Sequence, residues 1–231
     1  SEQFPEITRS LLQLNYPALQ EILPSSTVLG LRPDRESLTT IRTIQKGVRL
    51  SPKTDDDSLI TFTTAADTTL YPFHISGIQA QTAPFEFVDG ELTSAANAVL
   101  RVQIEMNDPG KMFSQLALDE IDLFLESDTV AAGRLTETLF SQLVNIQLSD
   151  RSGASLGLFG PDQMKSRAFD EDFCFLPTDR NSYLGIQLIR EFFSFPAKQA
   201  FVRLSGVGLA LQECNSPQLT IDFFLKNLDL S

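Results

Sequence analysis

Several residue types that build catalytic and metal centres are scarce in this chain of 231 residues. It has no tryptophan, one histidine and two cysteines. Cys174 and Cys214 lie far apart without metal-ligand spacing, and two cysteines are too few for a disulfide scaffold at this length, so we expect a reducing compartment. No apolar run is long enough for a transmembrane helix, and the first residues have neither the basic nor the apolar region of a signal peptide.

Positive charge is also in short supply. Lysine and arginine total 18 against 30 aspartate and glutamate residues, for a formal net charge of -12. This balance argues against nonspecific binding to nucleic acid or to an anionic membrane, because both need positive charge, and it leaves basic or neutral protein partners compatible. The hydrophobic content of 42% is enough for a sizeable core. The chain does not begin with methionine, and we expect it to be a piece of a longer protein.

Phenylalanine is abundant, with 18 residues, and the segment 183–204 is especially rich in it. The polar residues of its first half fall at i, i+3, i+4 and i+7, which places them on one narrow stripe of a helix: Gln187, Arg190, Glu191 and Ser194. Nearly all other positions are apolar. The pattern predicts a helix that is packed around most of its circumference, ended by Pro196 and followed by a strand.

The apolar positions of this helix are therefore expected to belong to the core. Asn181 or Ser182 is the expected N-cap. We expect four apolar side chains to hold the domain together: Ile189, Phe192, Phe193 and Phe195. If Phe193 is buried, its replacement by alanine should cost about 3–5 kcal/mol of stability.

Elsewhere the hydrophobic pattern alternates more often than it follows helical spacing. Two further helices are expected, over 6–15 with a short second turn to 23, and from Asp128 or Thr129 to about Val144. Segments 81–97 and 150–172 read as loops. Strands are expected at 27–31, twice within 40–50 around Gly47, and at 60–64, 68–80, 99–106, 116–125, 145–148, 173–176, 200–204, 207–211 and 219–225.

These elements indicate a β-rich α+β fold with antiparallel, sandwich-like sheets and about three helices, because repeating βαβ units are absent from the pattern. We expect residues 1–26 to form a helical lead-in. Residues 27–231 would form the β-rich region, either as one domain or as two subdomains, 27–97 and 98–231.

One short motif suggests catalysis. Gly153-Ala-Ser155-Leu-Gly157 matches the G-x-S-x-G nucleophile elbow of serine esterases. An elbow needs a strand before Ser155, a helix after it, and an acid and then a histidine later in the chain. Here Ser155 lies in a polar loop and the only histidine, His74, precedes it. We expect Ser155 to be an ordinary loop residue, with a serine esterase as the alternative.

The remaining candidates for chemistry have equally ordinary interpretations. His74 has no cysteine or carboxylate near it in sequence, so we expect a half-buried structural histidine. The acidic tracts Asp55–Asp57 and Asp170–Asp172 lack the glycine and distal glutamate of a calcium loop, and we expect solvated loops. Dinucleotide, Walker A, zinc-protease and Cys-x-x-Cys motifs are missing. We therefore expect no catalytic residue, no metal and no cofactor.

Four separated stretches of the chain are similar, in order, to the sequence motifs of one protein family. FPEITRSLL at 4–12, with Tyr16-Pro17 and Pro24-Ser25, is similar to the opening FPxLTxxLLxxLYP…PS. ITFTT at 60–64 and TLYP at 69–72 are similar to the FxT…LWP strand pair. LALDEIDLFL at 116–125 is similar to LxLDxLRFYL, and GIQLIREFFSFPAK at 185–198 is similar to the signature GYRLLQEYFAFPEKF. Taken in this order, the four stretches resemble the TssF family of type VI secretion system baseplate wedge subunits. The departures in the last stretch are Ile186, Gln187 and Gln199, where the family has Tyr, Arg and Phe.

The resemblance implies a structural role in a contractile injection system related to phage tails. TssF would assemble with TssG in a cytoplasmic wedge, contact TssK toward the membrane complex, and support the contractile sheath. TssE, the VgrG spike hub and a second TssF copy are the further partners implied in the inner-membrane-docked baseplate. Direct membrane insertion and nucleic acid are not expected. A stand-alone β-rich, phage-tail-like binding module is the other alternative.

Overall fold

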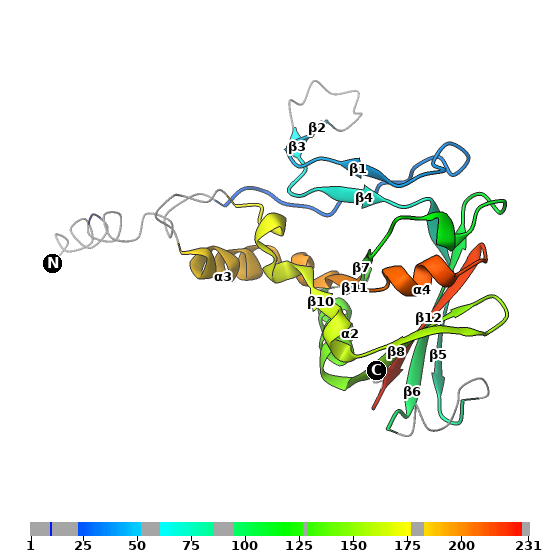
Figure 1. Cartoon of the computed structure of the whole chain (residues 1–231). Helices are drawn as coiled ribbons and strands as arrows, with labels where there is room; N and C mark the ends of the chain where they lie inside the picture. Colours follow the sequence, from blue (N-terminus) through cyan, green and yellow to red (C-terminus); the bar gives the residue numbers. More distant parts are fainter. Residues whose placement is uncertain are drawn as a thin grey trace.

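Two antiparallel sheets form the body of the protein (Figure 1). In this computed structural model, the structure describes residues 10, 23–51, 61–85, 95–126, 129–176 and 183–227. The larger sheet has the order β5-β6-β12-β8-β9. Its strands are β5 (Phe73–Thr82), β6 (Ala98–Met106), β12 (Gln218–Leu225), β8 (Leu143–Asp150) and β9 (Ser155–Phe159). The smaller sheet has the order β10-β11-β7, with β10 (Met164–Ser166), β11 (Phe201–Ser205) and β7 (Glu120–Phe124).

Two short strand pairs lie above the body in Figure 1. Strand β1 (Arg42–Ile44) pairs with β4 (Thr68–Leu70), and β2 (Arg49–Leu50) pairs with β3 (Phe62–Thr63). Gly47 has a φ of 90°, as the expected turn between β1 and β2 requires. Pro72 falls between β4 and β5, which fits a residue that cannot donate to a strand ladder.

Three α-helices are described: α2 (Thr129–Gln142), α3 (Leu184–Ser194) and α4 (Gly208–Glu213). Five short 3-10 segments join the elements: η2 (Phe113–Gln115), η3 (Pro161–Gln163), η4 (Arg167–Phe169), η5 (Glu171–Phe173) and η6 (Pro196–Ala200). The β-rich α+β fold expected from the sequence is confirmed. Of the described helices, none is long and apolar enough to cross a membrane.

The main core contains side chains from both sheets, α2, α4 and η2. Strand β6 contributes Val102, Ile104 and Met106, as its alternating pattern predicts. Ile104 faces Leu219 of β12, the central strand. Burial of such side chains contributes about 1.5–3 kcal/mol each, so this face of the larger sheet is a principal source of stability.

Several sequence-based expectations are wrong. The strand expected at 27–31 is irregular chain, because no described strand pairs with it. The strand expected at 207–211 is the N-cap residue Val207 and the start of helix α4, and Val207, Ala210 and Leu211 are buried at helical spacing. The loop expected at 150–172 contains β9 and β10, since Gly153, with a φ of 86°, lets the chain reverse tightly onto β8.

Other expectations lie outside the described residues: the helix over 6–15, the tract Asp55–Asp57 and the caps Asn181 and Ser182. The N-cap position of α3 is Tyr183. The division of the β-rich region at residue 97 stays a prediction.

Candidate functional site

Helix α3 carries a charged side chain on the face that packs against the protein. Glu191 is fully buried, and its Oε1 accepts hydrogen bonds from the backbone N–H groups of Phe175 and Leu176, both at 2.9 Å. Its other oxygen, Oε2, forms an ion pair with the Lys198 ammonium group. One carboxylate therefore joins α3 to the segment before it and to η6 after it.

The partners of Glu191 are held by the same small region. Lys198 is 2% exposed, and its Nζ lies 5.5 Å from the ring centre of Phe173 and 5.9 Å from that of Phe175. Gln187, one turn before Glu191, donates from Nε2 to the carbonyl oxygen of Leu176 at 2.7 Å. Burial removes water from the Lys198 ammonium group, and a carboxylate and two aromatic rings compensate for this lost hydration.

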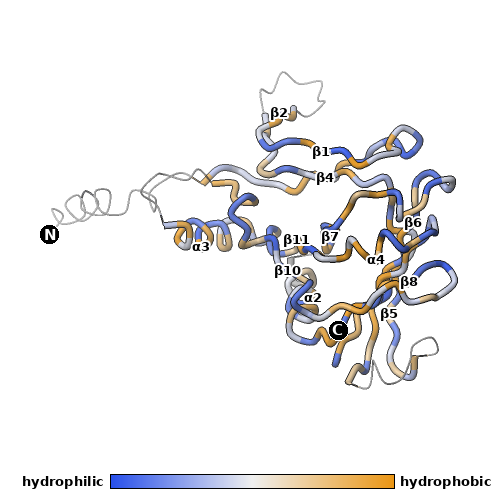
Figure 2. Tube along the Cα trace, viewed as in Figure 1, coloured by the Kyte–Doolittle hydropathy of each residue, from blue (hydrophilic) through white to orange (hydrophobic). Residues whose placement is uncertain are grey.

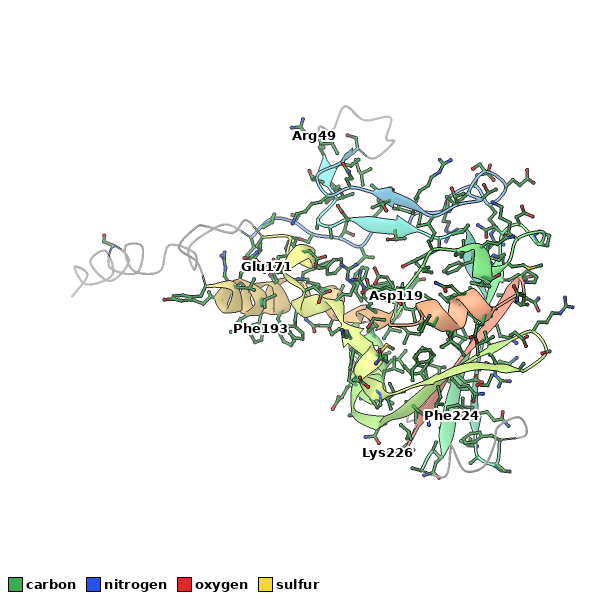
Figure 3. All side chains as sticks on the ribbon, in the orientation of Figure 1. Arg49, Asp119, Glu171, Phe193, Phe224 and Lys226 are labelled. Carbon is green, nitrogen blue, oxygen red and sulfur yellow. The ribbon has the colours of Figure 1, made fainter. Side chains whose placement is uncertain are left out.

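The apolar face of α3 points to solvent. Phe193 is 76% exposed, and Figure 3 shows it on the side of α3 away from Glu171. Tyr183, Ile189 and Phe192 are also exposed, and orange segments mark the helix in Figure 2. The expectation that Ile189, Phe192 and Phe193 hold the domain together is wrong, whereas Phe195 is half-buried and packs edge-on against Phe175.

The physical reason for this reversal lies in the contacts of the polar stripe. Two of its members, Gln187 and Glu191, satisfy backbone groups of Leu176 that would otherwise be buried without partners. An unmade buried hydrogen bond costs about 1–3 kcal/mol, which is comparable to burying one large apolar side chain. The polar stripe therefore faces inward, and the apolar stripe is left outside.

A second charged group lies in the smaller sheet. Asp122 of β7 accepts from Arg203 Nε at 2.6 Å and Nη2 at 3.0 Å, and from Arg167 Nη1 at 2.8 Å. The hydrogen bonds to Asp122 raise the pKa of Arg203. Arg167 is buried and also pairs with Asp170 and Asp172, at 3.3 and 3.7 Å.

The interpretation of the tract Asp170–Asp172 as a solvated loop holds for Glu171 and Asp172, which are exposed, but the tract is not an irregular loop. Glu171, Asp172 and Phe173 form the 3-10 segment η5, and two of the tract's carboxylates neutralise a buried guanidinium. Among the described residues, no group of three or more His, Cys, Asp or Glu side chains is arranged to hold a metal ion.

The structure does not bring the candidate esterase residues together. Ser155 begins β9 and His74 lies on β5, at opposite edges of the five-stranded sheet. Four strand spacings of about 4.8 Å separate these edges by about 19 Å. Ser155 is followed by strand β9, whereas a nucleophile elbow needs a helix there. His74 Nδ1 is hydrogen-bonded to Asn107 Oδ1 at 3.1 Å.

Both cysteines are buried and free. Burial raises the pKa of Cys174, and the nearby Glu191 carboxylate adds to this effect. Burial also raises the pKa of Cys214. Neither thiol has the exposed, electropositive surroundings of a reactive cysteine.

Comparisons with known proteins identify the family. The family model "Type VI secretion system, TssF" matches residues 1–231. The chain belongs to the TssF family. The "Type VI secretion system component TssF1" of Pseudomonas aeruginosa is 28% identical over 226 residues, which cover 95% of this chain and 36% of that protein. The chain thus spans about a third of the length of this curated relative.

A solved structure confirms the fold of this TssF-family chain. The chain is similar to one in the cryo-electron microscopy structure of the type VI secretion system TssK-TssF-TssG baseplate subcomplex, with a TM-score of 0.74 and 20% sequence identity. The match covers 99% of this chain and 41% of that one.

The TssF signature coincides with the α3 site. Residues 185–198, which resemble GYRLLQEYFAFPEKF, form α3 and the start of η6. Both members of the buried ion pair, Glu191 and Lys198, stand where this chain and the signature agree. Gln187 stands where the signature has arginine, and it is buried. Two charged residues seven positions apart in an apolar segment were the signal that sequence reasoning overlooked.

Proposed function

We propose that this chain is part of a structural subunit of the type VI secretion system baseplate wedge. The single observation that carries the proposal is the match of the TssF family model to all of residues 1–231. The likeness of its fold to a chain of a TssK-TssF-TssG subcomplex gives independent support. TssG and TssK are the partners proposed for the whole protein.

The finer proposals concern its place in the assembly. The subunit would act in the cytoplasm, beneath the contractile sheath of a baseplate docked at the inner membrane. TssE, the VgrG hub and a second copy of the subunit are its other proposed neighbours. Assemblies of this kind rely on large preorganised interfaces, and a β-rich body with an exposed apolar helix face supports such a role.

A non-catalytic role is part of the proposal. It is supported by the positions of Ser155 and His74 at opposite edges of the five-stranded sheet. His74 bonds to Asn107, so these two candidates do not form the nucleophile–base pair that a serine esterase needs. The full-length protein should not hydrolyse p-nitrophenyl esters above the rate of a Ser155→Ala variant. A serine-dependent rate would contradict the proposal.

Co-purification tests the partners. The full-length protein, tagged and co-expressed with the TssG and TssK homologues of its own organism, should retain TssG and TssK through size-exclusion chromatography. An unrelated acidic protein with the same tag is the control for nonspecific capture. Failure of the full-length protein to retain either homologue would overturn the wedge proposal.

A further inference from the structure

Strand β5 is the longest described strand and forms an open edge of the larger sheet. It runs for ten residues from Phe73 to Thr82, or about 34 Å, and pairs with β6 on one side. Within the part of the chain that the structure describes, its backbone bonds to β6 alone. Every residue from Ile78 to Thr82 is exposed. The backbone groups on the outer side of β5 therefore face solvent.

The pairing register shows which backbone groups point outward. Asn107, just after β6, donates its N–H to the carbonyl oxygen of Pro72, so it points at β5. Successive residues of an antiparallel strand direct their N–H and C=O groups to opposite sides. The β6 partner of Gln79 precedes Asn107 by six residues, an even number, so this partner and Gln79 point at each other. Ile78 and Ala80, on either side of Gln79, therefore direct their N–H and C=O groups outward.

The outer edge of β5 lacks most features that keep sheet edges from pairing. Natural edge strands are short, carry charged residues such as lysine, or contain proline or a bulge. Strand β5 has no lysine, arginine, aspartate, glutamate or proline, and its bulge between Ile75 and Gly77 leaves 77–82 as a regular edge. Of the other edges of the two sheets, β9 has 5 residues, β10 has 3 with a lysine, and β7 has 5 with two acidic residues. Strand β5 is the edge best suited to bind a further strand.

The side chains of β5 indicate what kind of strand would fit. Ile75 lies opposite Ile104 of β6, which is buried in the main core. Ile78 lies opposite Val102, another residue of that core. Ile75 and Ile78 are thus on the core side of the sheet, yet they are 49% and 61% exposed. A further strand with apolar residues on this side, and polar residues on the side of Gln79, would extend the core.

Two observations favour the subunit's own polypeptide as the source of that strand. The chain spans about a third of the length of its curated relative, so most of a protein of that length lies outside residues 1–231. Phe73 packs against the main core, so the uncovered side of β5 continues the interior of this body. A strand of the same polypeptide can bind without the entropy cost of bringing two molecules together. It would also cover the edge in the free subunit, where an open edge promotes aggregation.

We propose that, in the full-length protein, a strand from outside residues 1–231 pairs with the outer edge of β5 along residues 77–82. It adds a sixth strand to the larger sheet and covers the side chain of Ile78. The added strand is amphipathic, with apolar side chains on the side of Ile78 and polar ones on the side of Gln79. The pairing joins two parts of one polypeptide, so it does not depend on the proposed place in the baseplate.

Cysteine labelling compares the same position in the 231-residue chain and in the full-length protein. Ile78→Cys should react rapidly with a maleimide in the 231-residue chain and at least about 100-fold more slowly in the full-length protein. Arg151→Cys is the matched control, because Arg151 is exposed in the turn between β8 and β9 at the other end of the sheet. It should label equally fast in both proteins, and the native thiols are buried.

Proline substitution tests whether the cover is a paired strand. Ala80→Pro removes an N–H that points outward, so it should spare the pairing with β6 and change the Tm of the 231-residue chain by less than about 4 °C. In the full-length protein it should restore rapid labelling of Ile78→Cys. Ala80→Ser keeps the N–H and should leave the labelling slow. Gln79→Pro removes a donor to β6 and should lower the Tm more than Ala80→Pro does.

Four results would overturn the proposal. Rapid labelling of Ile78→Cys in the full-length protein would show that the edge is open there. Slow labelling in the 231-residue chain would show that β5 is covered without the rest of the polypeptide, by a second copy if the rate depends on concentration. Labelling that slows only when TssG and TssK homologues are added would assign the cover to a partner. Slow labelling that persists with Ala80→Pro would show a cover that is not a paired strand.

These results are separable from the proposed function. A full-length protein that retains TssG and TssK but labels rapidly at position 78 would refute the added strand alone. A full-length protein that labels slowly, and rapidly with Ala80→Pro, but retains neither homologue would refute the wedge proposal alone. Circular dichroism of each variant excludes misfolding as the cause of rapid labelling.

Discussion

Glu191 and Lys198 form a buried ion pair that joins α3 to η6, with exposed fractions of 0% and 2%. Because Glu191 also accepts two backbone hydrogen bonds, the pair fixes the orientation of the helix as well as its position. The sequence shows the helix, but this pair decides which of its faces meets solvent.

Breaking this pair should destabilise the protein strongly. Lys198→Met keeps most of the side-chain volume but leaves the Glu191 carboxylate buried without its cation, at a cost of about 3–5 kcal/mol. Urea unfolding followed by circular dichroism measures the loss. Lys165→Met, at an exposed position of β10, is the control and should change stability by less than about 0.5 kcal/mol. Equal effects of the two substitutions would contradict a special role for Lys198.

Truncation to alanine should lower the stability of the protein strongly at Phe223 and only slightly at Phe193. Phe223 is 2% exposed in the core, so Phe223→Ala should cost about 3–5 kcal/mol through lost burial and a cavity. Phe193→Ala removes an exposed ring from a helix and should stay within about 1 kcal/mol of the wild type. Thermal melts of dilute protein, where association is negligible, compare the two. A large loss of thermal stability in Phe193→Ala would mean that the ring of Phe193 is buried.

The turn between β8 and β9 should contribute a pH-dependent increment of stability. Asp150 Oδ1 accepts from Ser152 Oγ at 2.6 Å, and this hydrogen bond is the largest cause that lowers the pKa of Asp150 below its ordinary value. A lowered pKa means that the contribution is present above about pH 4 and is lost as pH falls through the folded-state pKa. Ser152→Ala should therefore cost up to about 1 kcal/mol at pH 7 and less near pH 3.

Two measurements check this turn. An NMR titration should show the Asp150 pKa rising toward its ordinary value in Ser152→Ala. Urea unfolding at both pH values should show the gap between variant and wild type narrowing in acid. If the difference in unfolding free energy between Ser152→Ala and the wild type is the same at both pH values, Ser152 does not act through the Asp150 carboxylate.

Both thiols should be unreactive in the folded protein. Burial raises the pKa of Cys174 and of Cys214, so at pH 8 little of either is thiolate and little reagent reaches it. With Ellman's reagent we expect slow labelling in buffer and rapid labelling of both thiols in urea. Rapid labelling of native protein would show that one of these sites opens readily.

Local pattern was a good guide where one face of an element meets the core. The alternation of β6 and the proline after α3 placed both elements within one or two residues. It failed at 207–211, because Val207, Ala210 and Leu211 are buried at helical spacing but a run of five residues is too short for periodicity to separate a helix from a strand. Strand order, such as the pairing of β1 with β4, depends on contacts between distant segments and was not predictable.

Helical periodicity placed Gln187 and Glu191 on one stripe of α3 correctly, but the expectation that the helix is packed around most of its circumference is wrong, because part of its apolar surface meets solvent. Which side of the helix is inside depends on the unpaired backbone groups of Phe175 and Leu176, which only the folded chain brings against Glu191. Apolar residues usually face the interior, but here the backbone groups that bind Glu191 place the polar stripe inside, and their position cannot be read from the sequence. The same holds for Asp122, whose two arginine partners come from 45 and 81 residues away.

Strand β12 is central in the larger sheet, between β6 and β8, yet it is the last described strand of the chain. During synthesis, β5 can pair with β6, and β8 with β9, well before residues 218–225 leave the ribosome. Until then, the inner edges of β6 and β8, which β12 later fills, are open to pairing with a wrong strand. The nascent protein thus has an interval of vulnerability to misassembly, and chaperones that shield strand edges would act there.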